Sequence, residues 1–387
     1  MFRFLLSRRT VVALVNTLFK HQKLITDSLR TKENRRKLTF TLTSVTLSYT
    51  GLLGLLFNKE NEESIVLLLK KGILAQSRMK YEEAEEFFHE AIKTFDRLNT
   101  ENSLNPVYRV NIYLYIANLY FETREYDKSL RLFQECLREL IAKLEYERNS
   151  EAVIEISLKL SQIFAYGLNS IHDAKVGFEF CIQAALSRIK EYETKELTEN
   201  LEKALINAKI LYVMILQTYG RYLLSLKENR QALSLLEQAN ILALQLFKQA
   251  KITNQQLGSL LNDLALANYG LNNYQKAIDV LNSALTYFDD ELKRIELEKV
   301  KPDFDFDTYV REKFDLNESK LVNLSNKCSS YFALKDFDQA NENCRNALRL
   351  FNKNNFNQNL ITTELVKEIE EVKKLLNDIN KEINKNN

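Results

Sequence analysis

The feature that most constrains this chain is a set of small and bulky residues that recurs at fixed spacing between residues 65 and 350. In each of five copies, six positions follow one another at offsets of 3, 6, 3, 4 and 3 residues. Small residues at fixed places with bulky ones between them indicate two antiparallel helices packed at their small positions. The copies are Gly72, Ala75, Tyr81, Ala84, Phe88 and Ala91; Ala117, Tyr120, Tyr126, Ser129, Phe133 and Cys136; Gly220, Leu223, Asn229, Ala232, Leu236 and Ala239; Ala265, Asn268, Tyr274, Ala277, Leu281 and Ala284; and Cys328, Tyr331, Phe337, Ala340, Cys344 and Ala347.

A sixth copy has its small positions, Ser161 and Ala174, thirteen residues apart rather than twelve. We expect the extra residue in the turn AYGLNSIHD, since a longer loop costs little. Most copies are 45 residues apart, against about 34 in a tetratricopeptide repeat, which predicts second helices longer by about two or three turns. Two wider steps hold insertions, and we expect residues 299–315, KVKPDFDFDTYVREKFD, to form a loop.

The chain of 387 residues contains only 8 glycines and 2 prolines, too few for the tight turns of an all-β or α/β fold. We therefore predict an all-α tetratricopeptide superhelix of about six helix pairs over residues 58–358. Residues 359–387 carry one apolar stripe at alternating steps of four and three, which predicts a helix that caps the open end of the array. The stripe consists of Leu365, Ile369, Val372, Leu376, Ile379 and Ile383.

Residues 1–37 form a basic leader, with ten Lys or Arg and two Asp or Glu, a net charge of +8. The remaining 44 basic and 50 acidic residues give −6, which argues against a nucleic-acid partner because phosphates require a basic face. The first 26 residues lack acidic side chains and interleave Arg and Lys with Leu, Val and Phe, the composition of a mitochondrial transit peptide. A secretory signal and an amphipathic first helix are the alternatives.

Residues 38–57, LTFTLTSVTLSYTGLLGLLF, carry no charge and have the length of a helix that crosses a bilayer. Their first half alternates polar and apolar residues like a β-strand, but a lone strand would have no partner in a helical chain. We therefore predict a membrane span, with an uncleaved polar helix or a longer presequence as alternatives. If the segment spans the inner mitochondrial membrane, the positive flank should stay in the matrix, and the flanking charges then predict that the repeats face the intermembrane space. These charges are Arg35, Arg36 and Lys37 before the segment and Glu60, Glu62 and Glu63 after it.

The motifs of catalysis are absent from the sequence. The four cysteines form no CxxC pair and no zinc spacing, so we expect each to act as a small apolar residue. Cys136 and Cys181 occupy second helices, and Cys328 and Cys344 lie on the facing helices of the last repeat. The only Gly-rich stretch, GLLG, lies in the predicted span, so no phosphate loop is expected. We predict a non-enzyme without cofactor, metal or small-molecule substrate.

The first helices of such an array line its concave side, where a peptide or partner helix would bind. Asn and Gln can bond a peptide backbone through donor and acceptor at once, and Arg221 could pair with a carboxylate. Exposed Asn and Arg are also common on helices without a role. By repeat register, the candidate binding residues are Asn111, Asn118, Gln217, Arg221, Asn262 and Tyr269.

Several segments resemble the mitochondrial tetratricopeptide repeat protein 19 family. Residues 151–186, EAVIEISLKLSQIFAYGLNSIHDAKVGFEFCIQAAL, are similar to its most distinctive segment, with IEISLKL and GFEFCI the most specific parts. Residues 220–239, 262–278 and 324–340 are similar to its later repeats, so the resemblance covers about residues 65–350. It implies a protein anchored in the inner-membrane lipid that binds respiratory complex III (cytochrome bc1). There it would support assembly or maintenance and help clear fragments of the Rieske iron–sulfur subunit.

Two other classes of protein fit the same pattern. One is a general adaptor or import and chaperone-docking receptor that grips carboxylate-ended peptides. Such a site requires two or three basic residues converging on the concave face, and the sequence supplies Arg221 alone. The other is a soluble regulatory repeat protein whose leader is its first helix.

Overall fold

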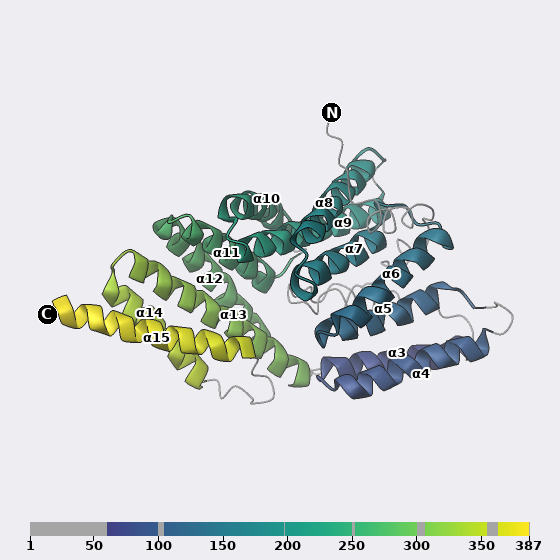
Figure 1. The fold of residues 1–387 in the computed structure, drawn as a ribbon, viewed down its shortest axis with the longest axis horizontal. Helices are drawn as coiled ribbons and strands as arrows, with labels where there is room; N and C mark the ends of the chain where they lie inside the picture. Colours follow the sequence, from purple (N-terminus) through teal and green to yellow (C-terminus); the bar gives the residue numbers. More distant parts are fainter. Residues whose placement is uncertain are drawn as a thin grey trace. The chain divides into compact units, whose positions relative to one another are not determined.

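The computed structural model describes residues 60–99, 104–196, 198–249, 252–299, 306–353 and 363–386. The predicted leader, residues 1–37, and the predicted span, residues 38–57, lie outside these ranges. Within the described ranges, none of the helices is both long enough and apolar enough to cross a membrane. The prediction of an all-helical repeat chain is confirmed, because helices follow one another through all of these ranges (Figure 1).

The chain divides into two compact units, Met1–Ile215 and Leu216–Asn387, with the division inside α9. We call them the N-terminal and C-terminal units. The first holds α3 (Glu60–Ser77), α4 (Tyr81–Leu98), α5 (Val107–Glu122), α6 (Tyr126–Ala142), α7 (Glu151–Gln162), the π-helix η2 (Ile163–Gly167), α8 (Ile171–Glu193) and the start of α9 (Glu199–Ser225). The second holds the rest of α9, α10 (Asn229–Lys248), α11 (Asn254–Gly270), α12 (Tyr274–Glu298), α13 (Phe306–Ala333), α14 (Phe337–Lys353) and α15 (Thr363–Asn386).

The small positions of the repeat lie where its two helices touch. Ala84, Ala232 and Ala277 are each fully buried on a second helix. On the first helices, a Cβ added to Gly72 would lie 2.4 Å from the Phe88 ring. A large side chain on one helix thus packs against a small residue on the other. This contact lets the two backbones approach closely and fixes the register of the two helices.

Each connection within a repeat holds one residue in the left-handed backbone region. These residues are Met79, Arg124, Asn169, Lys227, Asn272 and Lys335, with φ between 50° and 64°. In five of these turns, the residue that follows the left-handed one donates its backbone N–H to the carbonyl five residues before it. Glu228 N donates to Leu223 O in this way, at 2.9 Å. This arrangement ends the first helix in the manner usually supplied by glycine. It explains how a chain with few glycines still turns sharply six times in the part that the structure describes.

The extra residue of the third repeat is absorbed by η2 rather than by the turn alone. Leu168 N donates to Ile163 O at 2.9 Å, and Ser170 N donates to Phe164 O at 2.8 Å. The widened turn of helix takes up one residue, as π-helical segments do. Gly167 then packs so closely on Tyr126 that a Cβ there would lie 2.5 Å from the ring.

The long steps between repeats are filled mostly by helix. Among the second helices, α8 has 23 residues and α12 has 25, and the first helices α9 and α13 have 27 and 28. The prediction of a loop over residues 299–315 is wrong from Phe306 onward, because α13 begins there. Tyr309 and Lys313 lie one helical turn apart, and both donate to Glu296 of α12, at 2.7 and 2.6 Å. These contacts hold the start of α13 against the end of α12.

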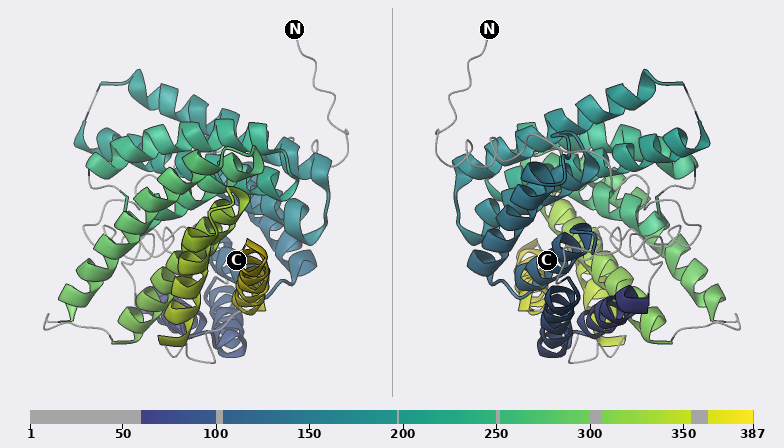
Figure 2. Two further views of the ribbon diagram at one scale, coloured as in Figure 1. Left: turned by 90° about the vertical axis from the view of Figure 1, so that its left-hand side faces the viewer. Right: turned by 90° about the vertical axis from the view of Figure 1, so that its right-hand side faces the viewer.

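The predicted capping stripe is confirmed in α15. Leu365, Ile369, Val372 and Ile379 are at most 3 % exposed and pack against α13 and α14. Leu376 and Ile383 are partly buried on the same core. α15 contacts both α14 and α13, and in Figure 2 it is seen nearly end-on beside α14. The helix therefore covers apolar surface of the last repeat that would otherwise face water.

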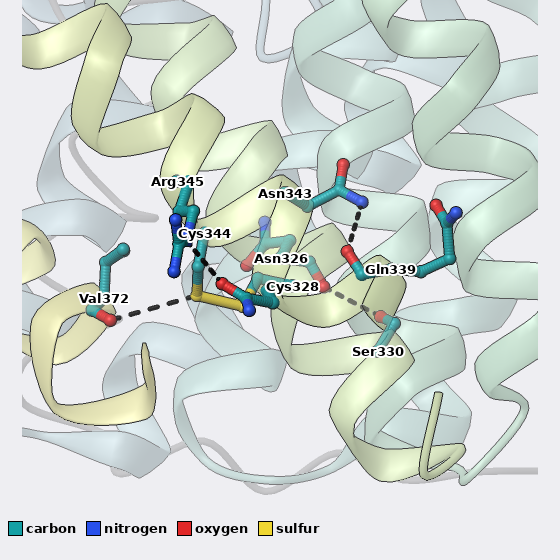
Figure 3. The surroundings of a disulfide bond; sticks show 9 residues. Asn326, Cys328, Ser330, Gln339, Asn343, Cys344, Arg345 and Val372 are labelled. Carbon is teal, nitrogen blue, oxygen red and sulfur yellow. Dashed lines mark hydrogen bonds between the residues drawn. A yellow bond between two sulfur atoms is a disulfide. The ribbon is translucent and has the colours of Figure 1, made fainter. Parts of the chain in front are cut away.

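Two of the cysteines correct our expectation of four small apolar thiols. Cys328 of α13 and Cys344 of α14 form a disulfide with a Cα–Cα distance of 5.3 Å (Figure 3). Cys136 and Cys181 remain free and buried, as expected of small apolar residues. A spacing of sixteen residues brings the first pair face to face across the helix hairpin, which the absence of a CxxC motif could not reveal.

Replacing Ala232 with Phe should lower the free energy of unfolding by about 1–3 kcal/mol, because the buried contact has no room for a ring. Thermal unfolding followed by circular dichroism measures the change. Gln238→Phe, at an exposed position of the same helix, is the matched control and should have little effect. Equal stability of the two variants would show that the helix contact does not lie at Ala232.

Candidate functional site

The first helices of the C-terminal unit carry two hydrogen-bonded groups of polar residues that meet at the neighbours Asn262 and Asp263, and we call them together the polar seam. It runs from α9 through α11 to α13. Gln217, Arg221 and Asn262 are among the predicted binding residues. The full set is Gln217 and Arg221 of α9, Ser259, Asn262 and Asp263 of α11, and Asn323 with the backbone carbonyl of Ser319 of α13.

Asp263 is the acceptor at the centre of one half of the seam. Arg221 Nε donates to its Oδ2 at 2.6 Å, and Gln217 Nε2 donates to the same oxygen. Arg221 Nη2 also reaches Ser259 Oγ at 3.2 Å. The Asp263 side chain is 10 % exposed and that of Arg221 38 %. Burial raises the pKa of the Asp263 carboxyl, while the Arg221 charge and the bonds from both donors oppose the rise.

Asn323 of α13 links the other half of the seam to α12, the second helix of the preceding repeat. Its Nδ2 donates to Asn262 Oδ1 at 3.0 Å and to the Leu281 carbonyl at 3.1 Å. Asn262 Nδ2 lies 3.4 Å from the Ser319 carbonyl, at the long end for a hydrogen bond. Since Asn323 is fully buried, these bonds satisfy its amide nitrogen, which would cost stability if it were left without acceptors. The seam is thus chiefly a device that sets the register of three neighbouring helices.

Four of the six candidate binding residues are buried, which corrects our expectation that they face an open groove. Asn111, Asn118, Gln217 and Asn262 are at most 7 % exposed. In the N-terminal unit, Asn118 Nδ2 donates to the Leu114 carbonyl of its own helix at 2.8 Å. A role for these four amides in binding a partner stays a prediction, because in this structure they lie beneath the surface.

Arg221 and Tyr269 keep partial exposure. Tyr269 is 37 % exposed, and its ring centroid lies 5.3 Å from that of Tyr274. Leu266, also 37 % exposed, precedes Tyr269 by three residues and follows Asn262 by four. This spacing places Asn262, Leu266 and Tyr269 along one face of α11. Leu266, Tyr269 and the guanidinium of Arg221 make up the exposed part of the site, which we call the α11 face.

Sequence reasoning missed Asp263, although α11 carried a signal for it. Asp263 is the only charged residue in that helix of 17 residues, NQQLGSLLNDLALANYG. A single charge in an otherwise uncharged helix requires a partner when the helix is buried. Its distance of 42 residues from Arg221 is within the usual reach of adjacent first helices in this array. Asn323 gave no comparable signal, since Asn is common on helix surfaces.

The N-terminal unit holds a second buried charge that the sequence did not single out. Lys159 of α7 is 3 % exposed, and its Nζ lies 4.5 Å from the centroid of the Phe121 ring. Burial lowers the pKa of the Lys159 ammonium to about 8, and the charges of Glu122 and Glu155 partly oppose this. An ammonium over an aromatic face keeps part of its stabilisation without water. Lys159 therefore helps to join α5 and α7.

The described ranges hold no group of three or more His, Cys, Asp or Glu side chains arranged for a metal ion. The chemistry that the site offers is recognition, through an aromatic ring, a leucine and a guanidinium.

Comparison with known proteins confirms the family resemblance. The chain is 32% identical over 184 residues to tetratricopeptide repeat protein 19, mitochondrial, of Homo sapiens, and 31% identical over 183 residues to the protein of that name from Rattus norvegicus. The first match covers 46% of each protein; the second covers 46% of this chain and 47% of the relative. A homolog from Drosophila melanogaster is 21% identical over 225 residues, or 58% of this chain and 55% of that protein. The chain spans about half the length of the curated relatives it matches.

No protein-family model matches the chain. Among solved structures, an assembly chaperone of RpL4 (Acl4) aligns with 85% of this chain and 98% of its own, at a TM-score of 0.48 and 12% identity. A likeness of that size says nothing about function.

Replacing Arg221 with Ala should lower the free energy of unfolding by about 1–3 kcal/mol at neutral pH, because it leaves the Asp263 carboxylate buried without its cation. Exposure of Arg221 to solvent screens the pair and keeps the loss below that of a fully buried one.

The pH dependence of this loss has a definite sign. When the pKa of a carboxyl is higher in the folded than in the unfolded chain, the free energy of unfolding falls as pH rises from the unfolded pKa through the folded one. Removal of Arg221 raises the folded pKa further, so the loss should be larger at pH 7.5 than near pH 4.5. Denaturant unfolding at both pH values measures it. Adding Asp263→Asn should recover much of the loss at pH 7.5, and equal losses at the two pH values would contradict the pairing.

Proposed function

We propose that this chain is a non-catalytic mitochondrial scaffold that is anchored in the inner membrane and binds respiratory complex III. There it supports assembly or maintenance of the complex, including clearance of Rieske iron–sulfur subunit fragments. The observation that carries the proposal is the match to curated proteins named tetratricopeptide repeat protein 19, mitochondrial, in three mammals. The basic leader of residues 1–37 supports the same location from an independent part of the chain.

The repeat fold suits such a role because it presents side chains on rigid helices. In the C-terminal unit, the buried seam sets the positions of α9, α11 and α13, and the α11 face lies on the same framework. Tyr and Arg are the side chains that most often dominate the energy of a protein interface. We therefore assign partner contact to Leu266, Tyr269 and Arg221.

The orientation follows from the charges that flank residues 38–57. Arg35, Arg36 and Lys37 remain in the matrix, and the repeats face the intermembrane space. The cluster domain of the Rieske subunit works on that same side of the membrane. The α11 face is thus on the side of the inner membrane where the proposed partner is accessible.

The alternative of an adaptor for carboxylate-ended peptides is less well supported. Such a site depends on basic side chains whose charge is available to the ligand. Arg221 already donates through Nε to Asp263 and through Nη2 to Ser259. A ligand carboxylate would have to compete with the buried one.

Complementation of mitochondria that lack the protein tests the proposal. Without it, complex III activity should fall and Rieske fragments should accumulate, and the intact chain should reverse both effects. A Leu266→Ser, Tyr269→Ser double variant should recover complex III in affinity purification at least about tenfold less well, since two interface anchors are lost. Ile241→Ser is the matched control, because Ile241 is an aliphatic side chain that is 63 % exposed and belongs to α10 rather than to α9 or α11.

Normal complex III activity and no fragments in mitochondria without the protein would favour the adaptor instead. If activity falls but the double variant binds like the control, the scaffold role stands and the α11 face is not its contact surface.

A further inference from the structure

The last repeat differs from the other five at the contact that joins its two helices. In those five, the small residue of the first helix and the bulky residue of the second are Gly72 and Phe88, Ala117 and Phe133, Ser161 and Phe178, Gly220 and Leu236, and Ala265 and Leu281. Each residue of these pairs is buried. In the last repeat, both positions are cysteine, and the disulfide takes the place of the contact between a bulky and a small side chain.

The second helix of this repeat buries little bulk. The fully buried hydrophobic residues of α14 are Ala340, Cys344 and Ala347, all small. The corresponding helix of the first repeat buries Phe88 between Ala84 and Ala91. With or without the bond, two cysteine side chains hold less volume than the alanine and leucine at the same positions of the preceding repeat, and a contact with less buried volume gains less stability from packing. The covalent bond supplies what packing does not.

The disulfide also lies beneath the capping helix. Both sulfurs belong to residues that are 0 % exposed, and Cys344 Sγ lies 3.9 Å from the Val372 carbonyl oxygen of α15 (Figure 3). Val372, Ile369 and Leu365 share one apolar core with the two cysteines. An oxidant cannot reach the pair once α15 is in place, so the bond forms before the cap packs.

We infer that Cys328 and Cys344 are an oxidative folding site, at which a dithiol–disulfide oxidoreductase closes the last repeat before α15 caps it. One cysteine thiolate attacks the disulfide of the oxidoreductase, which forms a mixed disulfide and releases one enzyme thiolate. The second cysteine then attacks the mixed disulfide and releases the other. Two electrons and two protons pass from the cysteine pair to the enzyme, which leaves as the dithiol.

The site therefore requires a compartment whose thiol chemistry is oxidising, since thioredoxin and glutathione keep such pairs reduced elsewhere. This agrees with repeats that face the intermembrane space rather than the matrix. The inference does not depend on which complex the protein binds.

The other two cysteines provide an internal contrast. Cys136 and Cys181 lie on second helices of the N-terminal unit, 45 residues apart and both fully buried. Burial raises the pKa of the Cys181 thiol to about 12 and that of Cys136 well above its usual value. Thiols held in the neutral form are poor nucleophiles and stay reduced. The chain should contain one disulfide and two thiols.

The redox state of the full chain in intact mitochondria tests the inference. Acid quenching, denaturation, alkylation and mass spectrometry should find Cys136 and Cys181 alkylated. Cys328 and Cys344 should be alkylated only after reduction. Alkylation of all four cysteines without a reductant would overturn the inference, whatever the outcome for complex III.

A designed replacement separates the effect of the disulfide from the effect of side-chain packing at the same contact. Cys328→Ala with Cys344→Leu copies the pair Ala265 and Leu281 and should cap normally without a disulfide. Limited proteolysis of the intact chain measures opening of α14 and α15. Natural chain that is reduced in denaturant and refolded with reductant should be cleaved there at least about tenfold faster than the oxidised chain, and the same treatment should leave the Ala–Leu variant unchanged.

Two further outcomes are decisive. A Cys328→Ser, Cys344→Ser variant should be cleaved as fast as the reduced natural chain. If reduction in denaturant before refolding does not speed cleavage of the natural chain, or speeds that of the Ala–Leu variant equally, the bond does not close this repeat.

Discussion

The contact between a bulky side chain on one helix and a small residue on the next is the interaction on which this structure depends. Phe88 reaches the backbone at Gly72, and Leu236 does the same at Gly220. Because the small residue has almost no side chain, the two helices approach closely, and the bulky one is covered on all sides. The same register recurs through the two units, so each repeat supplies an equivalent surface to its neighbour. The last repeat keeps the geometry and replaces the packing with a covalent bond.

The parts of the fold that follow from this period could be predicted from the sequence. Ala84 and Ala277 are buried where the spacing placed them, and α15 packs on its apolar stripe. The repeat period could not predict the conformation of the turns. Glycine usually marks a residue in the left-handed backbone region, but here residues such as Met79 and Lys335 adopt it. A helix was mistaken for a loop at residues 306–315, since its support comes from Glu296 on the preceding helix.

The binding residues were harder to predict for a related reason. Register places a side chain on a face of its helix, but exposure depends on what the neighbouring helices bring to that face. Asn262 and Gln217 point at partners supplied by α13 and α11, and so become part of the interior. Arg221 pairs with Asp263, a residue 42 positions away that carries no motif. Cys328 and Cys344 were placed on facing helices, yet a spacing that allows packing and one that allows a bond are the same. Of the six predicted binding residues, Arg221 and Tyr269 keep partial exposure, and the proposed partner contact of the α11 face depends on them.

A double-mutant cycle between Gly220 and Leu236 tests the central contact most directly. A Cβ at Gly220 would lie 2.8 Å from Leu236 Cγ, so Gly220→Ala should destabilise the natural chain. With Leu236→Ala present, the clash is gone, and the same change should stabilise by about 0.5–1 kcal/mol because alanine favours helix over glycine. The account therefore predicts that the effect of Gly220→Ala changes sign, with a coupling energy of at least about 1 kcal/mol. Additive effects in the two backgrounds would contradict it.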